Sequence, residues 1–400
     1  MAGVVESYRS LLYLDQVKER GATRIKSWSG PAAIEEYLAA ETKGRLIQSL
    51  KSFLSSRSLK STDVFGRRIT LEELIAKILR DLREKAETQF GARIEHAVVG
   101  RPVRFVGAEK SEDNSFAEER LRRAFHVAGF ASVEFELEPV AAAQYYESTL
   151  DHEELILIGD FGGGTSDFSL LRVSPEIRRH GRTPKDLLGN SGVGIAGDAF
   201  DARIVRNLVS PALGRGSQAQ SMNKVLPAVP NWVYAKLEHW HHLSFLRTNS
   251  TLNMLNSSKA TAFEPEKIEA LVHLIKEDLG YELHRSVQSL KIALSANASA
   301  PFRFSDGVVE IEACVERNSF EEWIAEELQQ IESCVDALVA ASGVGPRDVD
   351  MVFLTGGSSF VPAVRRIFEM RFGPDRIRTG NEFTSVARGL ALKALERSPS

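Results

Sequence analysis

Two aspartates flank three successive glycines in the segment Asp160-Phe-Gly-Gly-Gly-Thr-Ser-Asp167. Successive glycines let a backbone approach an anion closely and turn its amides toward it, and Thr165 adds a hydroxyl. Two carboxylates alone would repel phosphate, so the combination makes chemical sense when Mg²⁺ lies between them and the phosphate, usually through water. The pattern therefore indicates a phosphate site at Gly162, Gly163 and Gly164. A tight hairpin turn with acidic flanks is the alternative interpretation.

A second glycine corner follows the apolar segment Met351-Val-Phe-Leu354, as Thr355-Gly-Gly-Ser358. Open α/β sheets bind ligands beyond the carboxyl ends of their strands, which is where this corner would lie. Pro362 suits the first turn of a following helix. An ordinary strand-to-helix turn is again the alternative. If both glycine bends bind one ligand, we expect them to lie close together.

Two other patterns invite a functional interpretation that we do not favour. Gly192-Val-Gly-Ile-Ala-Gly197 satisfies G-x-G-x-x-G, but no clear strand precedes it, and no acid follows at the distance of a ribose ligand, so a glycine-rich turn is expected. His239, Trp240, His241 and His242 form a cluster in which only His239 and His242 share a helix face. Without a third ligand, packing or a solvated face is favoured over metal binding.

The elements around the first bend predict how it is held. Leu155-Ile-Leu-Ile158 is a wholly apolar strand, and Phe168–Val173 resumes strand character, so the glycines join a hairpin. Thr70-Leu-Glu-Glu73 and Ser319-Phe-Glu-Glu322 are capping boxes, the second expected to open a helix to about residue 341. Residues 301–314 alternate like a hairpin. Because strands alternate with long helices, the fold class is α/β.

Composition excludes several classes of protein. Among 400 residues, 43% are hydrophobic and the net charge is -4, which gives no general attraction to nucleic acid or anionic lipid. The two cysteines, Cys314 and Cys334, make neither a disulfide framework nor a metal pattern. No apolar run of about 18 residues and no secretory signal is present, so we expect a cytoplasmic protein without nucleic-acid or membrane partners.

At this point the motifs resemble those of the DnaK-type (70-kDa heat-shock) chaperones, which belong to the actin and hexokinase ATPase superfamily. The segment 160–167 resembles their second phosphate loop, Leu137-Glu-Pro-Val-Ala-Ala-Ala143 their first connecting helix, and residues 353–362 their adenosine loop. Val98-Val-Gly-Arg-Pro-Val103 is similar to a further strand and proline. The resemblance extends from about Ser10 to Leu395, and the absence of a downstream domain suggests the YegD-like branch.

The resemblance implies roles for individual residues. Asp160 would orient the attacking water and the metal shell, Asp167 and Thr165 would lie near the γ-phosphate and Mg²⁺, and Glu138 would hold metal-bound water. Lys51 matches the catalytic lysine of the family. The remaining residues implied to contact the nucleotide, ATP or ADP, are Gly356, Gly357, Ser358, Phe360, Gln288, Lys291 and Ser295.

Three departures from the family pattern accompany this resemblance. The family opens with an Asp-x-Gly-Thr-Thr turn, and nothing before Ser10 resembles it, so we expect this hairpin to be missing from the given sequence. Either the true start lies upstream of Met1, or the protein is a damaged or repurposed ATPase. The first is favoured because the remaining phosphate motifs are intact. Ile292 and Phe360 stand where the family often has arginines that sandwich adenine. Phe383 replaces an acid ahead of the second connecting helix, residues 384–391.

The resemblance implies an actin-like fold of two lobes around a nucleotide cleft. Lobe I would comprise residues 1–152 and 380–400, and lobe II residues 153–379 with a helical subdomain at about 204–295. The expected function is Mg²⁺-dependent ATP hydrolysis that drives lobe closure, without a peptide-binding domain. The alternatives are a catalytically impaired module that binds a nucleotide or a partner, and a small-molecule kinase, for which no substrate motif is visible.

Overall fold

The computed structural model describes residues 8, 10–19, 22–40, 44–180, 182–183, 185–221, 224–239, 242–243, 246–379 and 385–396. The chain forms two compact units, residues 1–196 with 329–400, and residues 197–328. The division into lobes at residues 152 and 379 is not tested by these units and stays a prediction. Trp240, His241, Phe383 and Thr384, which figured in the sequence analysis, lie outside the described residues.

A five-stranded sheet forms the centre of the first unit, in the order β10-β9-β8-β15-β16. β8, β9 and β10 are antiparallel neighbours, whereas β8, β15 and β16 run parallel. The bounds are Glu154–Phe161 for β8, Ser166–Val173 for β9, Leu187–Val193 for β10, Met351–Thr355 for β15 and Ile377–Thr379 for β16. The predicted hairpin around the glycines is therefore confirmed.

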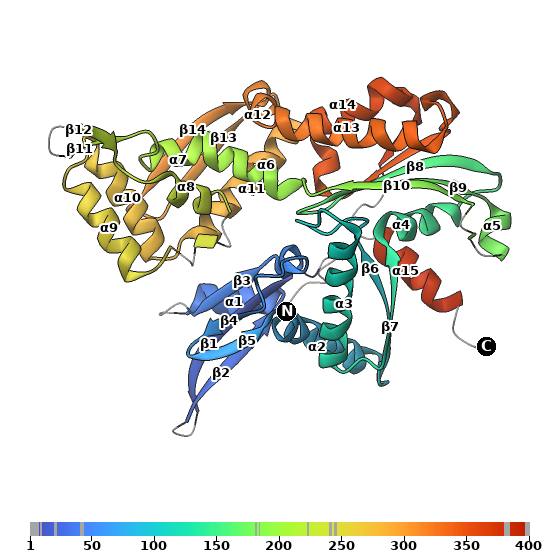
Figure 1. Cartoon of the computed structure of the whole chain (residues 1–400), viewed down its shortest axis with the longest axis horizontal. Coiled ribbons are helices and arrows are strands. Elements are labelled where there is room, and N and C mark those ends of the chain that lie inside the picture. Colours follow the sequence, from blue (N-terminus) through green and yellow to red (C-terminus); the bar gives the residue numbers. More distant parts are fainter. Residues whose placement is uncertain are drawn as a thin grey trace. The chain divides into compact units, whose positions relative to one another are not determined.

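Helices cover both faces of this sheet (Figure 1). α4 (Glu138–Glu147) places Ala142 and Ala143 in one apolar cluster with the β8 side chains Ile156 and Ile158. On the other face, Phe368 of α14 (Pro362–Phe372) packs against Phe161 and Phe168. Every residue of β8 is buried, as the wholly apolar run predicts for a strand enclosed on both faces.

The prediction that no strand precedes the G-x-G-x-x-G pattern is wrong. β10 extends to Val193 and contains Gly192, and Gly197 opens α6 (Gly197–Ile204). β10 pairs with β9 at the edge of the sheet and is only partly buried, so it carries Gly189, Asn190 and Ser191 in place of an apolar run. An edge strand of this composition gives no hydrophobic signal in the sequence.

A smaller three-stranded sheet, with the order β2-β1-β3, precedes the central one in sequence. It is followed by a 3-10 turn, η1, a β4–β5 hairpin and the long helix α2. Thr70 caps α2 by accepting from the Glu73 backbone N–H at 3.2 Å, while the Glu73 carboxylate accepts from the Thr70 N–H, so the predicted capping box is confirmed. The bounds are Leu11–Glu19 for β1, Ala22–Ser29 for β2, Pro31–Ala39 for α1, Arg45–Gln48 for β3, Leu50–Phe53 for η1, Ser61–Val64 for β4, Arg67–Thr70 for β5 and Leu71–Phe90 for α2.

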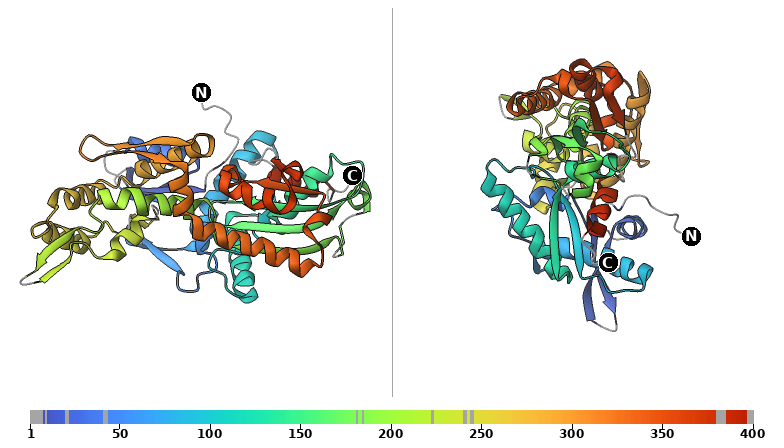
Figure 2. Two further views of the ribbon diagram at one scale, coloured as in Figure 1. Left: turned by 90° about the horizontal axis from the view of Figure 1, so that it is seen from above. Right: turned by 90° about the vertical axis from the view of Figure 1, so that its right-hand side faces the viewer.

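The parallel strands β6 (His96–Arg101) and β7 (Ser132–Leu137) lie side by side, joined through α3 (Ser111–Ala128) (Figures 1 and 2). Val99 of β6 packs into the cluster of α2 and α3, and α15 (Ser385–Glu396) contacts β6 as well. The absence of a side chain at Gly100 leaves room for Glu138, because a Cβ at this position would lie 3.1 Å from Glu138 Cγ. This pair therefore brings the end of β7, and with it Glu138, toward the middle of the unit.

The second unit is mainly helical and ends in a hairpin and a helix. The predicted hairpin is confirmed as β13 and β14, but the predicted start of the next helix is wrong. α12 begins at Arg317, directly after β14, and ends at Trp323, so the Ser319 pattern lies inside it and caps nothing. The bounds are Ser210–Ala212 for α7, Gln218–Ser221 for β11, Lys224–Pro227 for β12, Asn231–Leu237 for α8, Asn249–Lys259 for α9, Pro265–Lys276 for α10, Gly280–Ala296 for α11, Ser299–Ser305 for β13, Glu310–Glu316 for β14 and Ala325–Ser342 for α13, which crosses into the first unit. α5 (Pro175–His180) belongs to the first unit.

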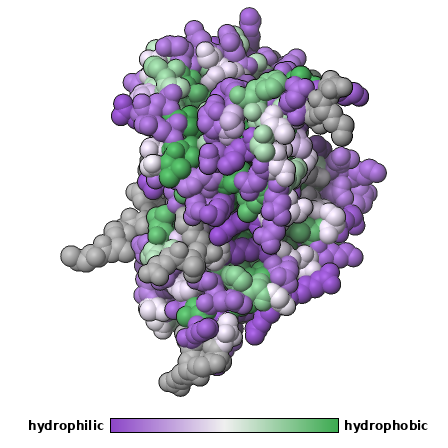
Figure 3. Space-filling model, turned by 90° about the vertical axis from the view of Figure 1, so that its left-hand side faces the viewer, coloured by the Kyte–Doolittle hydropathy of each residue, from purple (hydrophilic) through white to green (hydrophobic). Residues whose placement is uncertain are grey.

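On the face drawn in Figure 3, hydrophobic side chains form small areas separated by hydrophilic ones. None of the helices in the described part of the chain is long and apolar enough to cross a membrane.

Candidate functional site

The glycine bend between β8 and β9 is open to solvent although its acids are buried. The Gly162 N–H donates to the Thr165 carbonyl at 2.9 Å and closes the bend. Gly162 and Gly163 are exposed, whereas Thr165 is buried. Asp160 and Asp167 are register partners across the hairpin. The bend thus presents backbone to solvent directly beside two enclosed carboxylates.

Asp160 lies at the end of β8 and is held by a residue of the neighbouring parallel strand. The Thr355 hydroxyl donates to Asp160 Oδ1 at 2.8 Å, and Thr355 is fully buried. Burial and the nearby charge of Glu138 raise the pKa of Asp160 to about 6, against the opposing effects of Thr355 and Lys51. No local pattern indicates this role for Thr355, because the two residues are 195 positions apart in the sequence.

Asp167 is buried more completely. Its Oδ1 accepts the Arg104 backbone N–H at 3.2 Å, whereas its Oδ2 has no hydrogen-bond partner among the described residues. Burial and the charge of Glu138 raise the pKa of Asp167 to about 7, against the Arg104 N–H and the nearby Thr165 hydroxyl, which lower it; the Thr165 hydroxyl is not within hydrogen-bond geometry of Oδ2. A buried carboxylate oxygen without a donor is costly unless something else meets it. No motif in the sequence indicates the Arg104 contact either.

Lys51 and Glu138 form an ion pair in the same unit. The Lys51 ammonium lies 2.5 Å from Glu138 Oε1, and their side chains are 46% and 16% exposed. Although nearly half of the Lys51 side chain is exposed, the protein atoms around its ammonium act to lower its pKa, whereas Glu138, Asp167 and Asp160 together raise it above the ordinary lysine value. Glu138 also raises the pKa of both aspartates. Thr165 lies on the same bend as the two aspartates. The structure therefore brings together the five residues that were predicted to be catalytic, which are Lys51, Glu138, Asp160, Thr165 and Asp167.

The second glycine corner touches the first. Gly356 has φ +85, and a Cβ there would lie 2.1 Å from the carbonyl oxygen of Phe161, the residue that precedes the triple glycine. Only glycine fits this close approach with a positive φ. The Ser359 N–H and hydroxyl both donate to the Gly356 carbonyl, at 3.0 and 2.6 Å, and fix the corner. The two bends thus lie side by side on the parallel strands β8 and β15.

The residues predicted to contact the nucleoside belong to both units. Gln288, Lys291 and Ser295 lie on α11 of the second unit. Gly357 and the buried Ser358 follow the corner in the first unit, where Phe360 is 48% exposed. Lys291 lies 2.7 Å from Asp201 and donates to the Gly197 carbonyl, so within its own unit its ammonium is already paired. Their joint action on one nucleoside stays a prediction.

The donor set of the first unit fits a hydrated magnesium ion. The described residues contain no group of three or more His, Cys, Asp or Glu side chains arranged to hold a metal directly. Mg²⁺ usually keeps several waters and takes one or two carboxylates in addition to substrate phosphates. Asp160 and Asp167, with raised pKa values and one unmet buried oxygen, offer what such an ion requires, and Glu138 could accept from its water shell.

Comparisons with known proteins identify related sequences. A family model described as "Hsp70 protein" matches residues 38–224 and 267–399. The chain is 26% identical over 332 residues to the chaperone protein DnaK of Thermus thermophilus, which is 83% of this chain and 44% of the relative. It is 25% identical to DnaK of Thermosipho africanus, over 81% of the chain and 44% of the relative. For DnaK of Deinococcus deserti the identity is 26%, with 83% and 44% covered. The chain thus spans less than half the length of these relatives.

Proposed function

The chain belongs to the Hsp70 family, which has an actin-like ATPase fold, and from this premise we propose that it binds ATP with Mg²⁺ at the β8–β9 bend and hydrolyses it. The observation that carries the proposal is the pair Asp160 and Asp167. Both are buried with raised pKa values beside an exposed glycine bend, and none of the described residues donates a hydrogen bond to Asp167 Oδ2. Carboxylates in this state are expected where a cation arrives with the ligand.

The residues of this chain would act mainly by position and charge. Exposed backbone at Gly163 binds phosphate oxygens through its amide, while the Gly162 N–H closes the bend by donating to the Thr165 carbonyl. Asp160, fixed by the Thr355 hydroxyl, orients the attacking water, and Lys51 stabilises negative charge on the transferred group. Glu138 holds Lys51 in place and accepts from metal-bound water. When bound, Mg²⁺ neutralises charge on the phosphate oxygens.

Hydrolysis of ATP by this chain in the presence of Mg²⁺ tests the proposal. Asp160→Asn removes the charge but keeps the shape, and we expect kcat to fall by about 10²- to 10³-fold, the usual cost of losing one such electrostatic contact. Asp151→Asn is the matched control, because Asp151 is exposed and, in the described part of the chain, forms an ion pair with the neighbouring His152 alone, at 2.6 Å. Turnover that is equal in both variants would reject the role of Asp160.

Calorimetry distinguishes hydrolysis from binding alone. ATP that binds with Mg²⁺ but is not turned over would support the alternative of a catalytically impaired nucleotide-binding module. Absence of both binding and turnover would reject the proposed function. Closure of the lobes on ATP, and any action on client proteins, are further proposals that depend on a positive result here.

A further inference from the structure

Lys51 stands on a loop whose backbone needs outside support. The loop opens with Ser49, a non-glycine residue with φ +56, which is an unfavourable left-handed conformation. After the single turn η1, residues 54–59 form neither helix nor strand. The Leu54 N–H donates to the Lys51 carbonyl at 3.2 Å, so the segment just beyond η1 also closes the turn under Lys51. The Ser58 carbonyl accepts from the Lys60 N–H at 3.2 Å, but no described backbone N–H meets the carbonyls of Leu54, Ser56 and Leu59, which need other donors.

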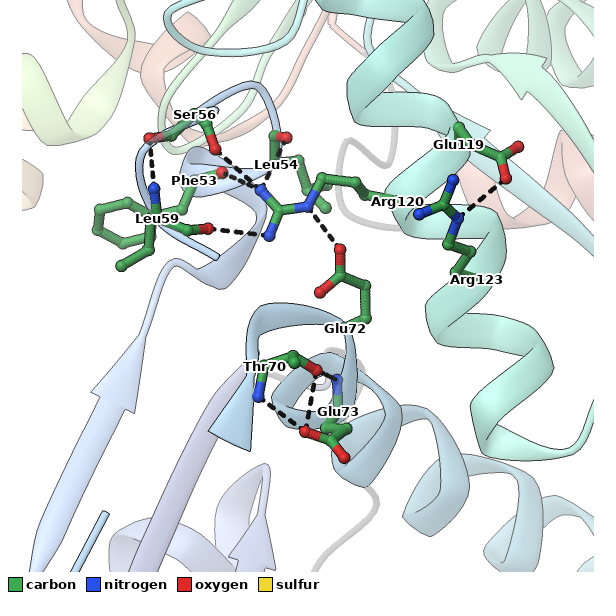
Figure 4. A network of polar contacts seen from close by, with 10 residues as sticks. All are labelled: Phe53, Leu54, Ser56, Leu59, Thr70, Glu72, Glu73, Glu119, Arg120 and Arg123. Atoms are coloured by element: carbon green, nitrogen blue, oxygen red, sulfur yellow. Dashed lines mark hydrogen bonds and ion pairs between the residues drawn. The ribbon is translucent and has the colours of Figure 1, made fainter. Parts of the chain in front are cut away.

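One buried arginine supplies those donors (Figure 4). Arg120 extends from α3, and only 4% of its side chain is exposed. Its Nε donates to Glu72 Oε1 at 2.6 Å. Its two terminal nitrogens donate to four backbone carbonyls, at 3.3 Å for Phe53, 3.3 Å for Leu54, 3.0 Å for Ser56 and 3.0 Å for Leu59. A single side chain therefore fixes the whole stretch from the end of η1 to the start of the β4–β5 hairpin.

The same stretch also contacts the loop that holds Asp167. The Ser55 hydroxyl donates to the Val106 carbonyl, two residues after Arg104, whose N–H binds Asp167. Gly107 adopts φ +72 there, and a Cβ would come within 3.3 Å of the Ser55 hydroxyl. The segment held by Arg120 thus leads to Lys51 in one direction and to the support of Asp167 in the other.

We propose that Arg120 is a positioning residue, which keeps the Lys51 ammonium against Glu138 and facing the two aspartates by fixing the carbonyls behind η1. The inference rests on the role of Lys51 in the proposed function. The planar guanidinium suits this task because its donors diverge and can reach carbonyls up to six residues apart. A lysine in its place would carry the charge but offer donors from one atom only.

Glu72 completes the arrangement. Its carboxylate stands in the first turn of α2, next to the capping box of Thr70 and Glu73 (Figure 4). Burial raises the pKa of Glu72, but the hydrogen bond and charge of Arg120 bring it below the ordinary value. The buried guanidinium therefore has a paired countercharge, as an arginine removed from solvent requires.

The first test measures the reactivity of Lys51 toward an amine-directed reagent as a function of pH, with the modified peptide quantified by mass spectrometry. We expect Arg120→Lys to release the Lys51 ammonium from Glu138, so that it is more accessible to the reagent and reacts several times faster at a fixed pH. Arg123→Lys is the matched control, because Arg123 lies on the same helix, is exposed and binds only Glu119 in Figure 4. Unchanged Lys51 reactivity in a folded Arg120→Lys protein would overturn the proposal.

A second variant covers the case in which Arg120→Lys does not fold. Glu72→Ala leaves the arginine in place but removes its countercharge, and we expect a smaller rise in Lys51 reactivity, about two- to threefold, since only one of the five contacts is lost. Unchanged reactivity in this variant would also contradict the positioning role.

Turnover adds a readout that a general structural defect would not reproduce. If Arg120 acts through Lys51, Arg120→Lys lowers kcat in the wild-type chain but has little further effect in a Lys51→Met background. Additive losses would assign Arg120 to stability alone. The reactivity of Lys51 does not depend on ATP, so a chain without turnover but with a responsive Lys51 would reject the proposed function and retain the positioning role.

Discussion

Asp160 and Asp167 of the first unit and Asp201 of the second are buried to a similar degree, but their charges are met differently. Asp201 lies 2.7 Å from the Lys291 ammonium and 4.0 Å from His284, so its own unit supplies the countercharge. The two aspartates beside the glycine bend have raised pKa values. Hydrogen bonding does not distinguish the two places, because Asp167 Oδ2 and both oxygens of Asp201 lack a hydrogen-bond donor among the described residues. The difference is the ammonium beside Asp201. A buried aspartate that forms an ion pair within its own unit stabilises the fold. Buried aspartates with raised pKa values and no such ion pair are candidates for binding a cation.

Removing the charge of Asp201 should be the most damaging change. Asp201→Asn leaves the largely buried Lys291 ammonium without its partner, and we expect the free energy of unfolding to fall by about 3 kcal/mol. Hydrogen exchange of the amides in α6 and α11 measures this within the second unit. The double variant Asp201→Asn/Lys291→Met is the control, because removing both charges should recover much of the loss. A single variant as stable as wild type would show that the pair does not stabilise this unit.

Removing the charges of Asp160 and Asp167 should instead increase the free energy of unfolding at high pH, and the pH dependence of unfolding should show this. Asp160 and Asp167 have folded-state pKa values of about 6 and about 7, above the ordinary 3.8, so the folded state binds more protons between those values. Their stabilising contribution is complete below about pH 4 and is lost as pH rises through 6 and 7. Relative to the variant Asp160→Asn/Asp167→Asn, we expect wild type to lose about 6 kcal/mol between pH 4 and pH 8, because the two pKa values are raised by about two and about three units.

Denaturant unfolding of the two proteins at a series of pH values checks this difference. Carboxylates with lowered pKa values elsewhere, such as Asp81 and Asp336, destabilise the folded state at low pH. Both proteins contain them, so their contribution cancels in the difference between the two unfolding free energies. A pH-independent difference would mean that the bend acids are ionised in the folded state as freely as in the unfolded chain.

Thr355 sharpens the comparison, because its hydroxyl is the internal hydrogen-bond donor to Asp160 from a neighbouring strand. Thr355→Val keeps the shape of the side chain but removes the donor, and we expect a loss of about 1 kcal/mol at pH 8, where Asp160 is ionised. The loss should shrink below pH 5, where the carboxyl is neutral. An equal loss at both pH values would indicate a packing defect. Ser359→Ala is a nearby control whose effect should not depend on pH.

The parts of the site that the sequence predicted are those set by local pattern. The apolar run of β8, the glycine bend and the capping box at Thr70 each depend on residues within a few positions, so their periodicity and composition indicate them directly. The helix start at Ser319 failed for a related reason. The pattern was present, but β14 passes into α12 two residues earlier, and strand pairing determined the boundary.

The residues that escaped prediction act across long separations in sequence. Thr355 reaches Asp160 over 195 positions, Arg104 reaches Asp167 over 63, and Arg120 reaches Leu59 over 61. A threonine at a strand end or an arginine on a helix carries no mark of such a contact, because the contact depends on which strands and helices become neighbours. The roles of Lys51 and Glu138 came from the family resemblance, and their ion pair became visible only in the fold.

Removing the charge of Glu138 should have the smallest effect on stability. It tests most directly whether neighbouring charge contributes to the raised pKa values of Asp160 and Asp167. Its charge raises the pKa of both bend aspartates, so Glu138→Gln should lower the midpoint of their pH-dependent destabilisation, by less than about one unit. Glu134→Gln is the control, because that charge pairs with Lys393 on α15 and is not among the causes that shift either aspartate. The midpoint is obtained from unfolding free energies between pH 4 and pH 8. If it stays in place in Glu138→Gln, burial alone raises these pKa values, and the cluster is held neutral by exclusion of water, with little contribution from neighbouring charge.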